Sequence, residues 1–80
     1  MTDDNKLRMT DAQHKAVKDN IIMMVEKDVI EKGDQANDIL KGCIVALESL
    51  GYVIPAYWPI IIWSGRCAYT EFKNIEEKAA

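Results

Sequence analysis

The chain has 80 residues, of which 49% are hydrophobic and 29% are charged, and its formal net charge is −3 at pH 7. This length allows one domain with one modest core and excludes a multidomain enzyme, because small chains bury a limited fraction of their surface. The balance of apolar and charged residues is that of a folded globular domain. A disordered segment would be depleted in aliphatic and aromatic residues.

The basic side chains are scattered along the chain from Lys6 to Lys78. Nucleic-acid binding needs basic residues concentrated on one face, so we expect no direct contact with nucleic acid. The longest apolar run, Ile60 to Trp63, is far shorter than the roughly 20 residues of a membrane-spanning helix. The polar N-terminus lacks the pattern of a secretory signal. We therefore expect a cytoplasmic protein without membrane contact.

Residues 1–9 show no apolar periodicity, which predicts a flexible N-terminal segment before a single helical domain over 10–80. Thr10 followed three residues later by Gln13 fits a capping box, which satisfies two free backbone donors at the start of a helix. Neither glycine nor proline interrupts the chain before Gly33. The first helix is therefore predicted over 10–32, with Gly33 ending it.

A second helix is predicted over 34–50, with Asp34 as its N-cap and Gly51 ending it. Gly42 lies at the edge of its apolar arc and costs about 1 kcal/mol of helix propensity relative to alanine, which indicates that another backbone passes close by. The apolar residues of this helix fall in one arc: Ala36, Ile39, Leu40, Cys43, Ile44, Ala46, Leu47 and Leu50.

A third helix is predicted over 58–76, because Pro59 is tolerated only in the first turn of a helix. As an alternative, 52–54 and 60–63 form two short strands, since β-branched and aromatic residues favour strands. An isolated pair of strands is only marginally stable. The expected fold is therefore all-α: a compact three-helix bundle, self-associating.

The first and third predicted helices each carry a second apolar stripe apart from the main one. On the first helix it lies on nearly the opposite side, and the residues of the two second stripes are Ala12, Ala16, Met23 and Ile30, and Ile60, Trp63 and Cys67. A monomeric bundle of this size cannot cover both stripes, and exposed apolar patches mark interaction sites. We therefore expect a homodimer, the commonest closed oligomer, unless the loop over 51–57 covers the second stripe. Tryptophan is enriched at interface hot spots. The predicted interface residues are Trp63, Ile60, Cys67, Arg66, Met23 and Ile30.

The sequence contains no phosphate-binding loop, dinucleotide fingerprint or nucleophile elbow. An acidic run crosses the junction of the first two helices without the spacing of a calcium-binding loop. Two cysteines without a CxxC motif and one histidine predict neither a disulfide framework nor a zinc site. We expect no enzyme activity, no metal and no cofactor.

These patterns predict a small interaction protein that acts by contact with a host or cognate protein. It would serve as a regulator, an inhibitor or a small subunit of a larger complex, and a phage or another mobile element is one source of such chains. An alternative function is an oligomeric small-molecule binder that sequesters a nucleotide-like ligand. The ligand-binding residues are not assigned. Arg66 and Lys73 beside the aromatic rings of Tyr69 and Trp58 have the chemistry to hold such a ligand, and the same set is equally typical of the rim of an amphipathic helix.

Overall fold

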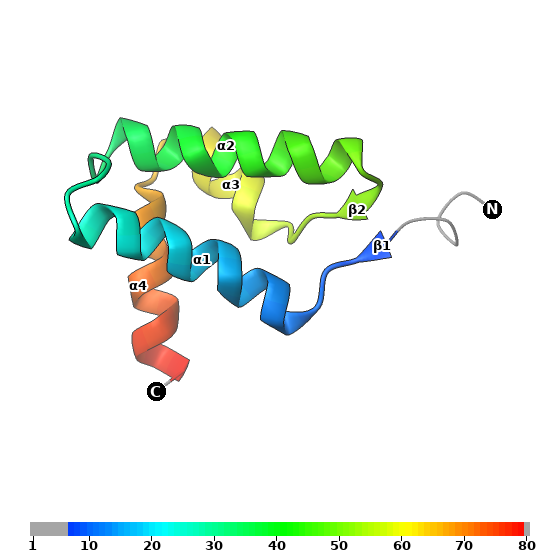
Figure 1. The fold of residues 1–80 in the computed structure, drawn as a ribbon, viewed down its shortest axis with the longest axis horizontal. Coiled ribbons are helices and arrows are strands. Elements are labelled where there is room, and N and C mark those ends of the chain that lie inside the picture. The colour runs from blue at the N-terminus through cyan, green and yellow to red at the C-terminus, as the bar shows by residue number, and fades with distance from the viewer. Residues whose placement is uncertain (1–6, 80) are drawn as a thin grey trace.

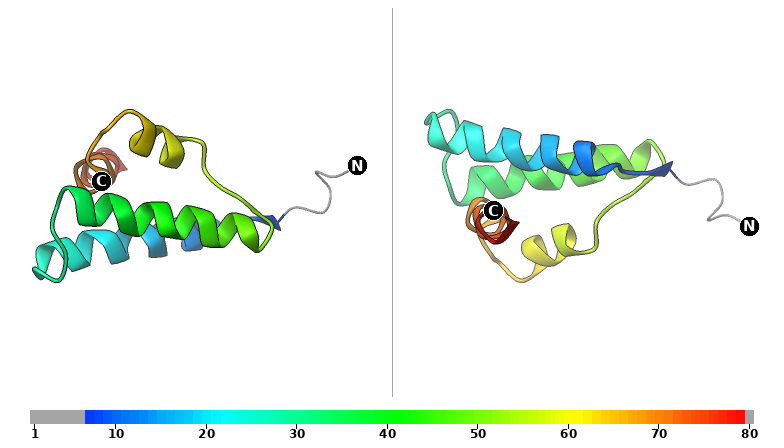
Figure 2. Two further views of the ribbon diagram at one scale, coloured as in Figure 1. Left: turned by 90° about the horizontal axis from the view of Figure 1, so that it is seen from above. Right: turned by 90° about the horizontal axis from the view of Figure 1, so that it is seen from below.

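The computed structural model describes residues 7–79. They form two short strands and four helices, in the order β1 (Leu7–Arg8), α1 (Asp11–Glu26), α2 (Asp34–Ser49), β2 (Tyr52–Val53), α3 (Tyr57–Trp63) and α4 (Ala68–Ala79). Helices α1 and α2 lie side by side and antiparallel (Figure 1). Helices α3 and α4 pack on one side of this pair, which gives the molecule two layers (Figure 2).

The predicted helical class is confirmed, but the predicted number of helices is wrong. The helix expected over 58–76 is divided at Gly65, which has a φ of 73°. The Gly65 N–H donates to the Ile62 carbonyl oxygen and the Arg66 N–H donates to that of Ile61. This pair of hydrogen bonds commonly ends a helix on a glycine. The chain therefore turns after α3 and begins a separate helix, α4.

The predicted end of the first helix, 10–32, is also wrong, because α1 ends at Glu26. Asp28 has a φ of 59°, and the Val29 N–H donates to the Met24 carbonyl oxygen. This is the same type of helix end, with aspartate in the left-handed position where glycine is usual. Aspartate tolerates that conformation better than most side chains do.

The predicted helix starts agree more closely with the structure. The Thr10 hydroxyl accepts a hydrogen bond from the Gln13 N–H at 3.1 Å, and the Gln13 side chain accepts one from the Thr10 N–H at 2.8 Å. The capping box is therefore confirmed. For α2 the prediction is wrong by one position, since the N-cap is Gly33 and Asp34 is the first helical residue.

Two short strands join the start of the chain to the link between α2 and α3. Leu7–Arg8 pairs in parallel with Tyr52–Val53, and Met9 is buried in the core. The predicted flexible segment therefore has a paired and partly buried end, while its residues 1–6 lie outside the described part of the chain. The alternative of a strand over 60–63 is wrong, because that segment is helical.

The centre of the core receives one large, fully buried side chain from each helix. These four side chains are Ile21, Leu40, Trp58 and Phe72. The rings of Trp58 and Phe72 meet edge to face, with centroids 6.3 Å apart, an arrangement that contributes about 0.5–1.5 kcal/mol beyond the burial of area. The indole N–H of Trp58 is buried and donates no hydrogen bond within residues 7–79. Trp58 thus fixes α3 to the core mainly by apolar packing.

Asn37 fixes the other end of α3. Its side-chain amide donates to the Arg66 carbonyl oxygen at 2.7 Å, and its side-chain oxygen accepts from the Ala68 N–H at 2.8 Å. That N–H belongs to the first turn of α4, where the backbone has no partner inside the helix. One side chain of α2 therefore holds the turn between α3 and α4.

We expect Asp28→Gly to raise the free energy of unfolding by about 0.5 kcal/mol, because glycine adopts a positive φ without a steric penalty. The measurement is urea denaturation followed by circular dichroism. The control is Lys27→Gly, since the neighbouring Lys27 has a φ of −96° and glycine there should lower the stability. A loss of stability in Asp28→Gly would contradict the expectation.

We expect Asn37→Ala to lower the free energy of unfolding by about 1–3 kcal/mol, because the Ala68 N–H and the Arg66 carbonyl oxygen lose their partner in a half-buried site. Urea denaturation measures this change. Asp38→Ala is the matched control, since Asp38 is the exposed neighbour on the same helix. Equal stability of the two variants would show that the bridge contributes nothing.

Candidate interaction surface

The two tryptophans of α3 have opposite environments. Trp58 is completely buried, whereas 84% of the surface of Trp63 is exposed. Ile60 lies one turn before Trp63 on the outward side and is 52% exposed. Because Trp58 and Ile61 direct the other side of the helix into the core, α3 has no freedom to rotate Trp63 inward. The exposure of Trp63 is therefore imposed by the fold.

A shallow groove runs between α2 and α3 next to Trp63. It has a volume of about 280 Å³ and is lined by Lys41, Ile44, Val45, Glu48, Pro59, Ile62 and Trp63. We call these residues together with Ile60 the α2–α3 face. Val45 is 58% exposed in the middle of the α2 side of the groove. The face thus has an apolar centre formed by two helices.

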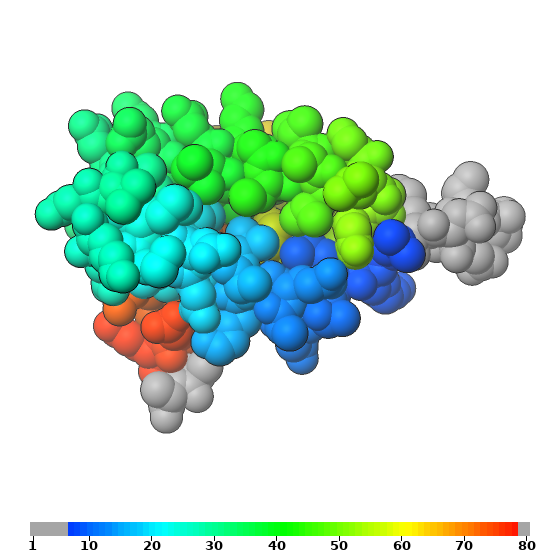
Figure 3. Space-filling model, viewed as in Figure 1, coloured from blue at the N-terminus to red at the C-terminus, as the bar shows by residue number. Residues whose placement is uncertain are grey.

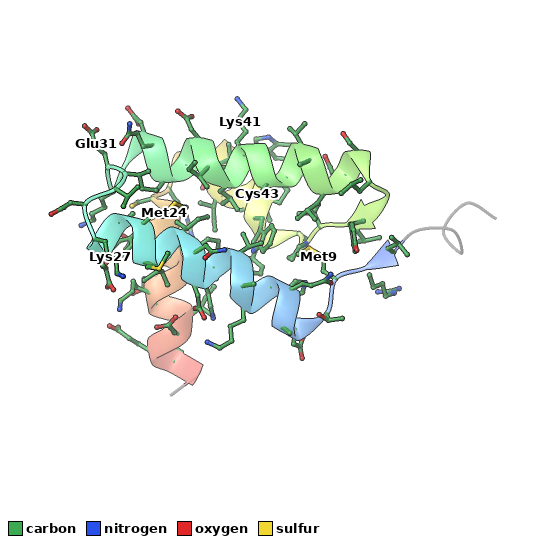
Figure 4. The ribbon with its side chains drawn as sticks, viewed as in Figure 1. Met9, Met24, Lys27, Glu31, Lys41 and Cys43 are labelled. Atoms are coloured by element: carbon green, nitrogen blue, oxygen red, sulfur yellow. The ribbon has the colours of Figure 1, made fainter. Side chains whose placement is uncertain are left out.

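The α2–α3 face lies away from the broad surface formed by α1 and α2. In the space-filling view the side chains of α1 and α2 cover most of the front of the molecule and largely hide α3 behind them (Figure 3). Lys41 points outward from α2, away from α1 (Figure 4). A Cβ atom at Gly42 would meet no atom within 4 Å, so the predicted close approach of another backbone to Gly42 is wrong. The outer side of α2 is open.

The predicted interface residues Arg66 and Cys67 lie in the turn between α3 and α4. The Arg66 guanidinium is exposed and lies 3.5 Å from the Glu71 carboxylate. The Cys67 thiol is half-buried and donates to the Lys32 carbonyl oxygen at 3.3 Å. Both residues therefore stabilise the turn, and their role in an interface stays a prediction.

The predicted residues Met23 and Ile30 lie elsewhere. Met23 is exposed and lines a hollow of about 410 Å³ beside α1, together with Asp19 and Glu76. Ile30 is half-buried and packs against the core. Of the six predicted interface residues, the structure brings Trp63 and Ile60 together on one face.

Val45 belongs to this face but was missed by the sequence analysis. The only sign of it is a single valine on the polar side of α2, between Lys41 and Glu48. The alternative that 51–57 covers the second stripe of the third helix is wrong for Trp63, which remains exposed. In that segment Tyr52 and Ile54 pack against the core instead.

The residues expected to hold a nucleotide-like ligand are engaged with other side chains. The Lys73 ammonium lies 3.3 Å from the Glu26 carboxylate, and the Tyr69 hydroxyl donates to the same carboxylate at 3.0 Å. A hydrogen bond to Glu26 raises the pKa of Lys73, and a separate hydrogen bond to Glu26 raises the pKa of Tyr69. Trp58 is buried and offers no free ring face. The structure therefore does not present this set as an open pocket.

The two cysteines are not joined in a disulfide. Both thiols are free and half-buried. Burial raises the pKa of the Cys43 thiol, which keeps it in the less nucleophilic protonated form. Within residues 7–79 no three side chains of the histidine, cysteine, aspartate or glutamate type gather where a metal ion could bind.

Among the helices of the described region, none combines the length and the apolar character needed to cross a membrane. The α2–α3 face contains three of the exposed apolar residues. Val45 and Trp63 line the groove, and Ile60 lies one turn before Trp63 on α3. Function must be inferred from this face, because comparison of the chain with protein-family models, with curated proteins and with solved structures found no match.

Proposed function

We propose that this chain is a small protein–protein interaction module that self-associates as a homodimer through the α2–α3 face. The observation that carries the proposal is the 84% exposure of Trp63 on a helix whose other tryptophan is buried. Burying a large apolar side chain contributes about 1.5–3 kcal/mol. A partner that covers Trp63 gains this free energy.

The composition of the α2–α3 face supports a protein partner. Interfaces concentrate aromatic and aliphatic residues at the centre and keep charged residues at the rim. Trp63, Ile60 and Val45 supply the apolar centre, while Lys41 and Glu48 lie on the rim. The face therefore has the arrangement of an interface core with its rim.

The backbone of α3 is anchored on both sides of the face. Trp58 fixes the start of α3 in the core, and Asn37 fixes the turn that follows it. Binding therefore orders few side chains, which lowers the entropic cost of association. A stable interface usually buries about 800 Å² on each partner, and the three exposed apolar side chains of this face supply only part of such an area. The expected homodimer is weak and depends on concentration.

A weak homodimer suits a regulator, an inhibitor or a small subunit, since the same face then becomes available to a host or cognate protein. A cytoplasmic location belongs to this proposal. The nucleotide-like ligand finds less support, because Trp58 is buried and Lys73 is paired with Glu26. That alternative stays a prediction from the sequence.

We expect Trp63→Ala to weaken self-association about tenfold or more, because it removes the anchor of the face. Ile60→Asp should act in the same direction by placing a charge in the apolar centre. Both positions are exposed, so helicity and the free energy of unfolding should change little. Sedimentation equilibrium measures the association, and circular dichroism measures the helicity.

The matched control is Val29→Ala, since Val29 is 66% exposed in the link between α1 and α2 and should leave association unchanged. A second measurement is acrylamide quenching of tryptophan fluorescence in the wild type, because Trp63 is exposed and Trp58 is completely buried. The quenching of Trp63 should fall as the concentration rises. A wild-type chain that stays monomeric at millimolar concentration would contradict the proposal.

A further inference from the structure

We infer that the two copies meet with their α2 helices antiparallel, so that a two-fold axis passes beside Val45 and each Lys41 faces Glu48 of the other copy. This inference rests on the proposed self-association and specifies its geometry. The partner is a second copy of this chain, and the contact combines the apolar groove with two symmetric charge pairs.

The placement of two opposite charges on α2 carries the inference. Lys41 and Glu48 line the two ends of the groove, and Val45 lies between them. An α-helix has about 3.6 residues per turn and rises about 1.5 Å per residue, so Lys41 and Glu48 lie about two turns apart on the same side of α2. In a two-fold dimer the same patch meets itself. When the two α2 helices are antiparallel, Lys41 of each copy faces Glu48 of the other copy.

A parallel arrangement of the same two helices would have the opposite electrostatic effect. Lys41 would face Lys41 of the second copy, and Glu48 would face Glu48, and like charges across an interface are strongly unfavourable. The order of charges along α2 therefore selects the antiparallel dimer. Apolar contacts are non-directional, so the charges alone distinguish the antiparallel arrangement from the parallel one.

Both side chains are available for such pairs. Lys41 and Glu48 are exposed, and Lys41 points outward from α2 (Figure 4). The ion pairs formed within residues 7–79 are Lys15–Asp19, Arg66–Glu71 and Lys73–Glu26. None of these pairs uses Lys41 or Glu48, so a second copy would not have to break an existing pair.

The groove gives each Trp63 a place in this dimer. The rotation that brings α2 against α2 also brings the two grooves together, because the groove lies along α2. Its walls include Pro59 and Ile62, and its volume is about 280 Å³. Each Trp63 can thus be covered by the groove of the other copy.

The experiment exchanges the charges one at a time and then mixes the variants. Lys41→Glu and Glu48→Lys should each weaken the homodimer about tenfold or more, because two attractive pairs become two repulsive ones. An equimolar mixture of the two variants should recover a dimer about as strong as that of the wild type, since every pair across that heterodimer is again of opposite sign. Sedimentation equilibrium, with one variant labelled, measures the homodimers and the heterodimer.

The controls are Lys27→Glu and Glu31→Lys, which change the net charge equally at exposed positions off the α2–α3 face (Figure 4). Neither control should weaken the homodimer, and their mixture should show no preference for a heterodimer. If the wild type dimerises but the Lys41 and Glu48 variants behave like the controls, the antiparallel geometry is wrong and the proposed function stands. If the two variants dissociate but their mixture does not recover the dimer, the geometry is again wrong. A monomeric wild type overturns the proposed function and this geometry together.

Discussion

The burial of Trp58 is the contact on which the rest of the structure depends. Helix α3 spans Tyr57–Trp63, and isolated helices shorter than about 12–15 residues are marginal in water. Its stability must therefore come from packing, and Trp58 supplies that packing by meeting Phe72 of α4 and the other buried side chains at the centre. Because Trp58 directs one side of α3 into the core, Trp63 on another side of the same helix faces solvent.

Helix α3 has a second anchor, which is polar, in the side chain of Asn37. Asn37 bridges the Arg66 carbonyl oxygen and the Ala68 N–H, so the end of α3 is tied to α2 by directional bonds while its start is tied to the core by apolar contact. The α2–α3 face is therefore built on a helix with two separate anchors.

The sequence is sufficient to predict the helical class, the capping box at Thr10, most of α2 and the outward stripe of Ile60 and Trp63. It is not sufficient to predict where α1 and α3 end. Gly65 falls on an apolar stripe and resembles a packing residue, and Asp28 resembles a surface acid, although both adopt a left-handed conformation that ends a helix. The role of Asn37 depends on a turn that is distant in the sequence, so helical periodicity assigns it to the polar face.

The buried indole N–H of Trp58, which donates no hydrogen bond within residues 7–79, has a consequence for the stability of the chain. A buried donor without a partner costs about 1–3 kcal/mol, which is a large share of the stability of so small a domain. Binding that is restricted to the folded state adds stability in proportion to the logarithm of the binding partner's concentration. In the proposed homodimer, abundance would thus become a determinant of folding: dilute molecules would be the ones most exposed to proteolysis, and accumulation would protect them.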